Sequence, residues 1–217
     1  MNNKTQQTQI AGPAGSLEAQ IDEADQNVPF KGTAVIAHPH PLYGGDMNNK
    51  VVQTLAKAFI TAGYKAIRFN FRGVGKSGGE YANGVGETDD LLAIIAAYAP
   101  AGNICLGGFS FGTFTVTHAL QSLARSGRDL ETDVQRIALI GSAAGKFDLA
   151  PIAPELHNRT FVLHAEADDT VPLSAVMDWA RPQALPVLVI PGAGHFFHGQ
   201  LGLLKQSILQ GLNFTHE

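Results

Sequence analysis

The sequence predicts an α/β protein with a doubly wound, mostly parallel sheet and an N-terminal antiparallel hairpin. Short apolar runs of strand length alternate with segments whose apolar residues recur at helical spacing. The apolar runs are nearly continuous, which is typical of parallel strands covered by helices on both faces. The chain has 217 residues, 45% hydrophobic and 16% charged, so we expect one domain over residues 8–217 and a disordered polar tail over residues 1–7.

The first predicted element is the hairpin, over residues 8–24. Two short segments with alternating apolar residues flank Gly12-Pro13-Ala14-Gly15. Glycine and proline favour a tight turn, so the two segments are expected to pair as antiparallel strands.

The rest of the chain alternates between strands and helices. The helices are indicated by apolar residues at helical spacing, and two of them stop at a glycine. Residues 144–159 carry no clear element, so any inserted cap is small. The predicted strands are 32–37, 65–71, 103–109, 136–143, 160–166 and 186–190, and the predicted helices are 49–63, 87–99, 111–127, 173–180 and 203–214.

Composition and charge exclude several classes of protein. The net charge of −4 gives no support for a nucleic-acid partner. The longest apolar runs are strand-sized, far below the roughly 20 residues that a membrane helix needs. The N-terminus is polar without an apolar signal core, and Cys105 is the single cysteine. We therefore expect a cytoplasmic protein with no nucleic-acid or membrane partner. Composition leaves both a monomer and a homodimer open.

The stretch "GGFSFG" carries the pattern G-x-S-x-G, with Ser110 between Gly108 and Gly112. A predicted strand precedes it and a predicted helix follows, which is the context that a nucleophile elbow requires. The glycines let the backbone turn sharply, so that the serine hydroxyl is held clear of the sheet beside the helix N-terminus. Ser110 is therefore the predicted nucleophile.

A serine needs a base and an orienting acid, and both are expected just after later strands. Asp168 and Asp169 follow the strand 160–166, and His195 follows the strand 186–190. The order serine, acid, histidine is that of α/β-hydrolases. Asp168 is favoured as the acid because it lies four residues before Pro172, where the loop turns into the next helix. Asp169 has the alternative of an exposed loop acid or a helix cap.

Five motifs together resemble a known family. They are "HPHPLYGGDMNNKVV", "FNFRGVGKSGG", "GGFSFG", "HAEADDTVP" and "GAGHFF". From the hairpin to the last helix, the chain resembles the α/β-hydrolase fold superfamily, in the small, cap-poor serine esterase branch related to dienelactone hydrolases. The resemblance implies a carboxylesterase of small esters without a cofactor, with Ser110 as nucleophile, His195 as base and Asp168 as orienting acid.

The oxyanion of the transition state needs two backbone donors. One is expected from Phe111, next to the nucleophile, and the other from the loop after the first parallel strand. In that loop Pro39 and Pro41 have no N–H, which leaves His40, Leu42 and Tyr43. Leu42 is favoured, because the glycines at 44 and 45 allow a close approach to substrate. Tyr43 and Phe197 are predicted walls of an acyl pocket.

Three alternatives stay open. The first is a thioesterase or acyltransferase with the same triad. The second is a non-catalytic binding relative, which the intact triad disfavours. The third, less favoured, is a metal-dependent hydrolase using His38, His40 and Asp46, since no further ligand cluster completes that site. Asp46 or Asn48 is instead expected to cap the following helix.

The stretch "GVGKSGG" imitates a phosphate-binding loop. Its first glycine would fall on Asn70, and no helix follows it, so nucleotide binding is not predicted. Arg72, just before it, is expected to be a structural loop arginine. His164, in the strand that precedes the acid loop, is likewise expected to be structural.

Overall fold

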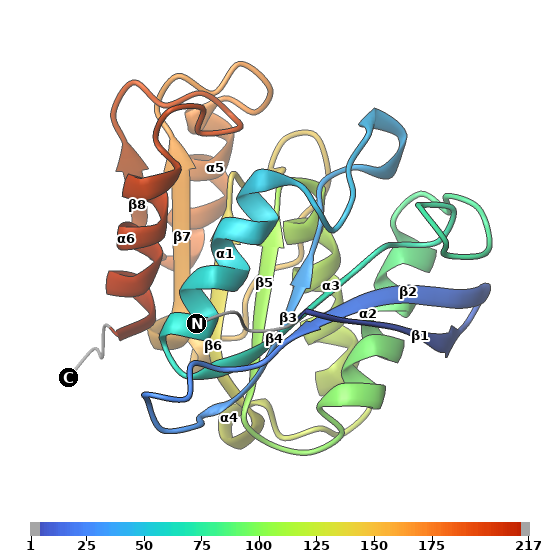
Figure 1. Ribbon diagram of the computed structural model, residues 1–217. Helices are drawn as coiled ribbons and strands as arrows, with labels where there is room; N and C mark the ends of the chain where they lie inside the picture. Colours follow the sequence, from blue (N-terminus) through green and yellow to red (C-terminus); the bar gives the residue numbers. More distant parts are fainter. Residues whose placement is uncertain (1–4, 214–217) are drawn as a thin grey trace.

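The computed structural model describes residues 5–213, and it confirms the predicted fold class. An eight-stranded sheet has the order β1-β2-β4-β3-β5-β6-β7-β8 (Figure 1). β2 pairs antiparallel with β1 and β4, and every pairing from β4 to β8 is parallel. The strands are β1 (Gln6–Gly12), β2 (Gly15–Asp22), β3 (Gly32–Ala37), β4 (Tyr64–Phe69), β5 (Ile104–Phe109), β6 (Val134–Ile140), β7 (Thr160–Ala165) and β8 (Val187–Ile190).

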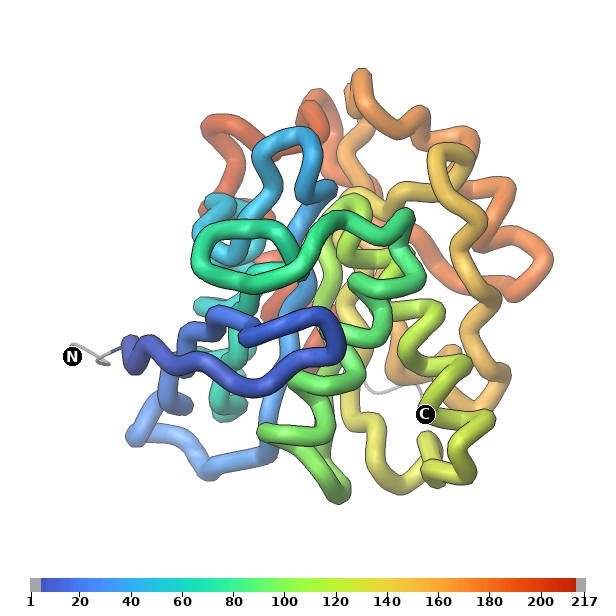
Figure 2. The backbone as a smooth tube through the Cα atoms, turned by 90° about the vertical axis from the view of Figure 1, so that its right-hand side faces the viewer, coloured from blue at the N-terminus to red at the C-terminus, as the bar shows by residue number. Residues whose placement is uncertain are grey.

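Helices cover both faces of the sheet (Figures 1 and 2). Side chains of α1 and α6 form one apolar core with the sheet, and side chains of α2, α3, α4 and α5 form the other. The α-helices are α1 (Lys50–Thr61), α2 (Val85–Tyr98), α3 (Phe111–Arg125), α4 (Leu130–Asp133), α5 (Leu173–Ala180) and α6 (Leu201–Asn213). Short 3₁₀ helices are η1 (Pro41–Tyr43), η2 (Pro154–Arg159) and η3 (Arg181–Gln183). None of the helices within residues 5–213 combines the length and hydropathy needed to cross a membrane.

Differences from the predicted elements are local. β1 already begins at Gln6, inside the predicted tail, and residues 1–4 of that tail lie outside the described residues. The single turn of α4 was not predicted, because four residues are too few to show a helical period. Asn49 caps α1 by accepting the Val51 N–H, so the predicted caps, Asp46 and Asn48, were wrong by one to three positions. Asp46 instead accepts the Asn48 N–H at 2.7 Å, one turn earlier.

Arg72 has the predicted structural role. Its backbone N–H and two guanidinium nitrogens donate to Asp90 at 2.8–3.0 Å, and both side chains are buried. Because Asp90 lies on α2, this pair ties the loop after β4 to the helix that follows. The arginine therefore stabilises the loop that only imitates a phosphate-binding motif.

His38 joins the ends of β3 and β4. Its Nε2 accepts the N–H of Phe71 at 3.0 Å, so the proton sits on Nδ1, which donates to the Pro39 carbonyl at 2.6 Å. The ring is fully buried, and burial lowers the pKa of His38 to about 3. The folded protein therefore holds this imidazole neutral.

This neutral histidine predicts a pH-dependent stability. Between pH 6.5, the ordinary pKa of histidine, and about pH 3, the unfolded chain takes up a proton that folded His38 refuses. Stability is then lost as the pH falls, by about 1.4 kcal/mol per pH unit. In His38→Gln, the amide oxygen can still accept the Phe71 N–H. This variant should therefore show a free energy of unfolding that changes less with pH, measured by urea titration from pH 7 to pH 4.5. The exposed His198→Gln is the control, and equal slopes in wild type and His38→Gln would contradict this account.

Candidate active site

Ser110, His195 and Asp168 meet at one edge of the sheet, although they are far apart in sequence. Ser110 directly follows β5, Asp168 follows β7, and His195 follows β8. His195 Nε2 lies 3.0 Å from Ser110 Oγ, and His195 Nδ1 lies 2.7 Å from Asp168 Oδ2. All three residues are at most 9% exposed. The structure thus brings the three predicted residues into one hydrogen-bonded chain.

The turn at Ser110 holds its side chain at the end of the sheet. Ser110 has φ +53° and ψ −119°, a conformation that costs a non-glycine residue strain. The neighbouring glycines make this turn possible, since a methyl group on Gly108 would collide with the Gly112 carbonyl, and one on Gly112 would collide with Ala37. The Ser110 N–H donates to Ile140 at 3.0 Å, which anchors the turn to β6.

Asp168 is held by its own loop. Its Oδ1 accepts the N–H groups of Thr170 at 2.9 Å and Val171 at 2.7 Å, while Oδ2 accepts from His195. Burial by itself would raise the pKa of Asp168, but these hydrogen bonds and the His195 ring hold it below its ordinary value. The neighbouring Asp169 has Thr170 Oγ1 at 3.3 Å and no contact with His195. Of the two acids, Asp168 is therefore the one that orients the histidine.

The hydrogen bonds of His195 determine its tautomer. A carboxylate only accepts, so Nδ1 carries the proton toward Asp168, and Nε2 has a free lone pair for the Ser110 hydroxyl. The rings of Phe109 and Phe196 lie 5.1 Å and 5.0 Å from the imidazole centroid. The arrangement can remove a proton from a serine that attacks an electrophile.

In the loop after β3, the backbone N–H that stays free is not the one that was predicted. The Leu42 N–H donates to His40 Nδ1 at 3.2 Å, and the Tyr43 N–H donates to the His40 carbonyl at 3.2 Å. The hydrogen bonds of this loop therefore contradict the preference for Leu42. The His40 N–H has no acceptor among residues 5–213, and His40 lines the pocket with Ser110. The two flanking prolines were the sequence signal for His40, because they isolate its N–H in the loop.

Phe111 begins α3, so its N–H has no carbonyl one turn back inside the helix. It is adjacent to the nucleophile, as expected. The N–H groups of Phe111 and His40 remain the two candidate donors toward a developing oxyanion.

The metal interpretation has no support in this geometry. Both ring nitrogens of His38 are used inside the fold, and His40 has Leu42 on Nδ1 and the Tyr81 hydroxyl 3.1 Å from Nε2. Asp46 turns to the Asn48 N–H. Across residues 5–213, no group of three His, Cys, Asp or Glu residues is arranged to hold a metal ion.

A pocket of about 530 Å³ contains Ser110 and His195. Tyr43 lines it as predicted, but Phe197 does not, because it is fully buried in the core shared by α1 and α6. The turn from Gly194 to Phe197 places the two adjacent phenylalanines on opposite sides, so Phe196 is the one at the pocket. The other lining residues are Pro39, His40, Gly44, Gly45, Asn49, Ala143, Lys146, Phe147, Thr170 and Val171.

Lys146 and Phe147 were not predicted at the site. They come from the segment without a clear element, where an isolated bridge joins Ala144 and Phe147. The N–H of Ala143 donates to Thr113 Oγ1 at 3.1 Å, which ties this segment to the start of α3. Such a turn has no repeating pattern, so only the folded chain shows that it reaches the pocket.

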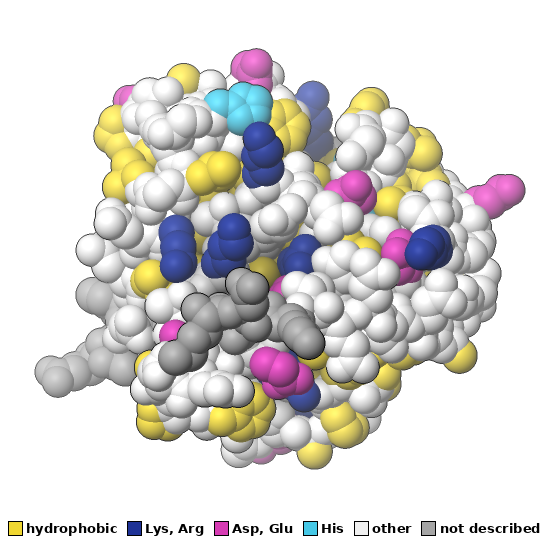
Figure 3. All heavy atoms as spheres, in the orientation of Figure 1, with side chains coloured by type: hydrophobic (Ala, Val, Ile, Leu, Met, Phe, Trp, Pro, Cys, Tyr) yellow, Lys and Arg dark blue, Asp and Glu magenta, His cyan; other side chains and the backbone are white. Residues whose placement is uncertain are grey.

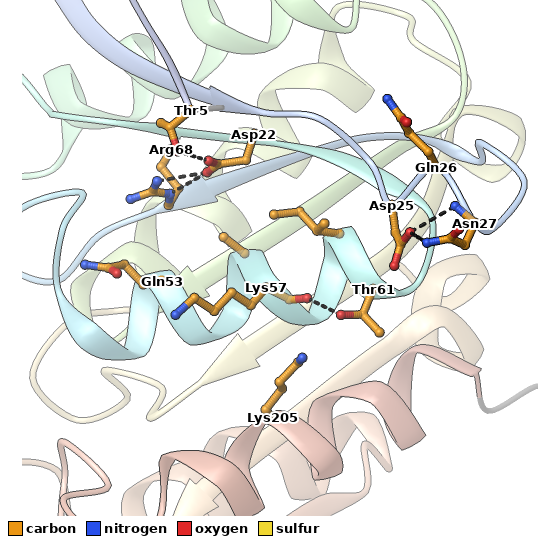
Figure 4. Close-up of a pocket in the computed structure, with 12 residues that line it drawn as sticks. Thr5, Asp22, Asp25, Gln26, Asn27, Gln53, Lys57, Thr61, Arg68 and Lys205 are labelled. Atoms are coloured by element: carbon orange, nitrogen blue, oxygen red, sulfur yellow. Dashed lines mark hydrogen bonds and ion pairs between the residues drawn. The ribbon is translucent and has the colours of Figure 1, made fainter. Parts of the chain in front are cut away.

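A larger cavity, of about 730 Å³, lies elsewhere, between the end of β2, α1 and α6 (Figure 4). Its wall includes the buried ion pair of Arg68 and Asp22, with 2.8 Å between the charged atoms, and Lys57 and Lys205 extend from the two helices. Figure 3 shows Lys and Arg side chains gathered over the middle of this face. No member of the Ser110 chain lines this cavity, whereas Ser110 and His195 both line the smaller pocket.

Comparison with known proteins finds one relative by sequence and several by structure. No family model matches the chain. The uncharacterized protein RP471 of Rickettsia prowazekii is 33% identical over 202 residues, covering 86% of this chain and 79% of that protein. The crystal structure of XC6422 from Xanthomonas campestris, a member of the α/β serine hydrolases without lid, is 32% identical with a TM-score of 0.84, covering 98% of this chain and 95% of that one. An α/β serine hydrolase homologue from Coxiella burnetii is 35% identical with a TM-score of 0.77, covering 98% of both chains.

These similarities extend over 86% to 98% of this chain. The identity of about a third is accompanied by the same arrangement of strands and helices. Together they show that the chain belongs to the α/β serine hydrolases.

Proposed function

We propose that the protein is a carboxylesterase that cleaves small, short-acyl carboxylic esters through an acyl-enzyme. The observation that carries the proposal is the continuous hydrogen-bonded chain Ser110–His195–Asp168 at the base of an open pocket. Membership of the α/β serine hydrolases supports a hydrolase. The ester specificity and the catalytic roles below are part of the proposal.

In the first half-reaction Ser110 attacks the ester carbonyl. His195 Nε2 takes the hydroxyl proton as the new C–O bond forms, and then donates it to the leaving alcohol. Asp168 keeps the Nδ1 proton in place and stabilises the charged imidazole in between. The bond from carbonyl carbon to alcohol oxygen breaks, which leaves the acyl group on Ser110.

In the second half-reaction water takes the place of the alcohol. His195 removes a proton from the water as it attacks the acyl carbon, and returns that proton to Ser110 Oγ. The carboxylic acid leaves, and the hydroxyl is restored. In both steps the N–H groups of Phe111 and His40 donate to the carbonyl oxygen as it becomes negative.

The walls of the pocket favour short acyl groups. Tyr43 is 87% exposed and Phe196 44% exposed, so the pocket opens directly to solvent. An alkyl chain gains about 0.8 kcal/mol for each methylene that it buries. A chain that outgrows the pocket buries no more surface, and the gain stops.

Removal of the nucleophile is the first prediction. Ser110→Ala should lower hydrolysis of p-nitrophenyl acetate by at least about 10⁴-fold. It should also abolish labelling by a fluorophosphonate probe. The exposed Ser126→Ala is the matched control and should keep both properties, and EDTA should leave wild-type activity unchanged. Labelling or turnover that survives in Ser110→Ala would exclude Ser110 as the nucleophile.

The second prediction isolates the N–H of His40. His40 has φ −55°, which proline also adopts, so His40→Pro deletes the N–H with little backbone change. His40→Ala removes the same imidazole but keeps the N–H. We expect kcat of the proline variant to be about 10²- to 10³-fold below that of the alanine variant, the usual cost of one oxyanion donor. Equal kcat values for the two variants would assign the second donor to another group.

The third prediction concerns chain length. In a series of p-nitrophenyl esters from acetyl to dodecanoyl, kcat/KM should stop rising at a short acyl chain, once the chain outgrows the pocket. The matching thioesters, assayed in parallel, test whether the same site prefers a thiol leaving group. A rate that rises steadily up to dodecanoyl would contradict the short-acyl assignment.

A further inference from the structure

A second histidine lies behind the acid of the Ser110 chain. His164 is the last but one residue of β7 and is fully buried. Its Nε2 is 3.0 Å from the Val171 carbonyl oxygen and 3.5 Å from Asp168 Oδ2. We propose that His164 is a positioning residue that fixes the Asp168 loop, and through it the orientation of His195. The inference rests on the proposed function.

The hydrogen bond assigns the proton of His164. A carbonyl oxygen only accepts, so Nε2 carries the hydrogen and donates it to Val171. Nδ1 then holds a lone pair, and this buried atom has no hydrogen-bond partner among residues 5–213. A buried polar atom without a partner is costly, so the favourable polar contact of this ring is the one that Nε2 makes.

The bond to Val171 closes a ring of contacts around the acid. The chain leaves β7 after Ala165 and reaches Asp168, whose Oδ1 accepts the Val171 N–H. The Val171 carbonyl in turn accepts the hydrogen bond of His164 Nε2. Val171 is therefore held on both sides, and it also lines the active-site pocket. The carboxylate cannot rotate away from His195 without breaking one of these bonds.

His164 acts as a neutral dipole. Burial lowers the pKa of His164, and the nearby His195 lowers it further. The hydrogen bond to the Val171 carbonyl and the charge of Asp168 raise this pKa, but the net shift is downward. The titratable groups that act on the ring are thus Asp168 and His195. A charged His164 would compete with His195 for the same carboxylate oxygen, whereas a neutral one leaves the charge of Asp168 to the base.

Three variants of His164 test its Nε2–H separately from the rest of the ring. The side-chain amide of His164→Gln reaches about as far as Nε2, so it can still donate to Val171. The amide of His164→Asn reaches only as far as Nδ1 and cannot. His164→Met, with no N–H, fills the space by apolar atoms and should behave as the Asn variant does.

The measurements are kcat, KM and the pH dependence of kcat/KM with p-nitrophenyl acetate. Rates are divided by the concentration of Ser110 that the fluorophosphonate labels. A lower folded fraction of a variant then does not lower its kcat. We expect the Asn and Met variants to lose about tenfold in kcat, well short of the roughly 10⁴-fold loss that follows a change of the acid itself. KM should change little, and the Gln variant should recover most of kcat.

The pH profile gives an independent readout. A looser Asp168 favours the protonated imidazole of His195 less, so the acidic limb of kcat/KM should move to lower pH in the Asn and Met variants, by about half a unit. A merely structural role for His164 would lower the yield of titratable Ser110 without moving this limb.

Two results would overturn the inference. One is a normal kcat and an unmoved limb in the Asn or Met variant, and the other is a Gln variant as slow as the Asn variant. Failure of the proposed function looks different, because wild type itself would then be inactive on all esters. In that case the rate at which fluorophosphonate labels Ser110 replaces kcat in the same comparison of variants.

Discussion

The left-handed turn at Ser110 is the constraint on which the rest of the site depends. A β-strand that ends in such a turn delivers its next side chain above the sheet edge and starts a helix immediately. The turn is strained, and it persists because the backbone of Ser110 is bound to β6 and because Gly108 and Gly112 leave room for close backbone contacts. With Ser110 fixed in this way, His195 and Asp168 need only to follow other strands of the same parallel sheet to reach it.

Three histidines near strand ends show how environment decides the role of one residue type. His38 has both ring nitrogens bound inside the protein, and His164 is bound through one nitrogen and buried at the other. Burial lowers the pKa of both rings, so both serve as neutral connectors between loops. His195 differs because one nitrogen is bound to a carboxylate while the other faces the serine in the pocket. Only that arrangement combines a fixed tautomer with an available lone pair.

The pocket is built from loops instead of an inserted cap. Its aromatic walls come from three separate connections, through Tyr43, Phe147 and Phe196, and two of these side chains are well exposed. The rigid part of the site therefore lies at its base, where the sheet edge and the start of α3 meet. For the proposed esterase, such a site orients the reacting carbonyl but encloses little of a long substrate.

The sequence by itself determined the order of strands and helices, the elbow and the serine–acid–histidine set. Each depends on a local pattern, such as apolar periodicity or glycines around a serine, or on the rule that side chains after parallel strands converge. Other features could not be predicted, because they depend on single hydrogen bonds or on one residue of register. They are the cap at Asn49, the turn of α4, and the positions of Phe196 and Phe197. Which N–H of the loop after β3 stays free was decided only by the tertiary structure, since it depends on how the His40 ring folds back onto Leu42. The contact of His164 with the loop of Asp168 was also decided only by the tertiary structure. The sequence of a strand does not indicate which residues of the following loop will contact it.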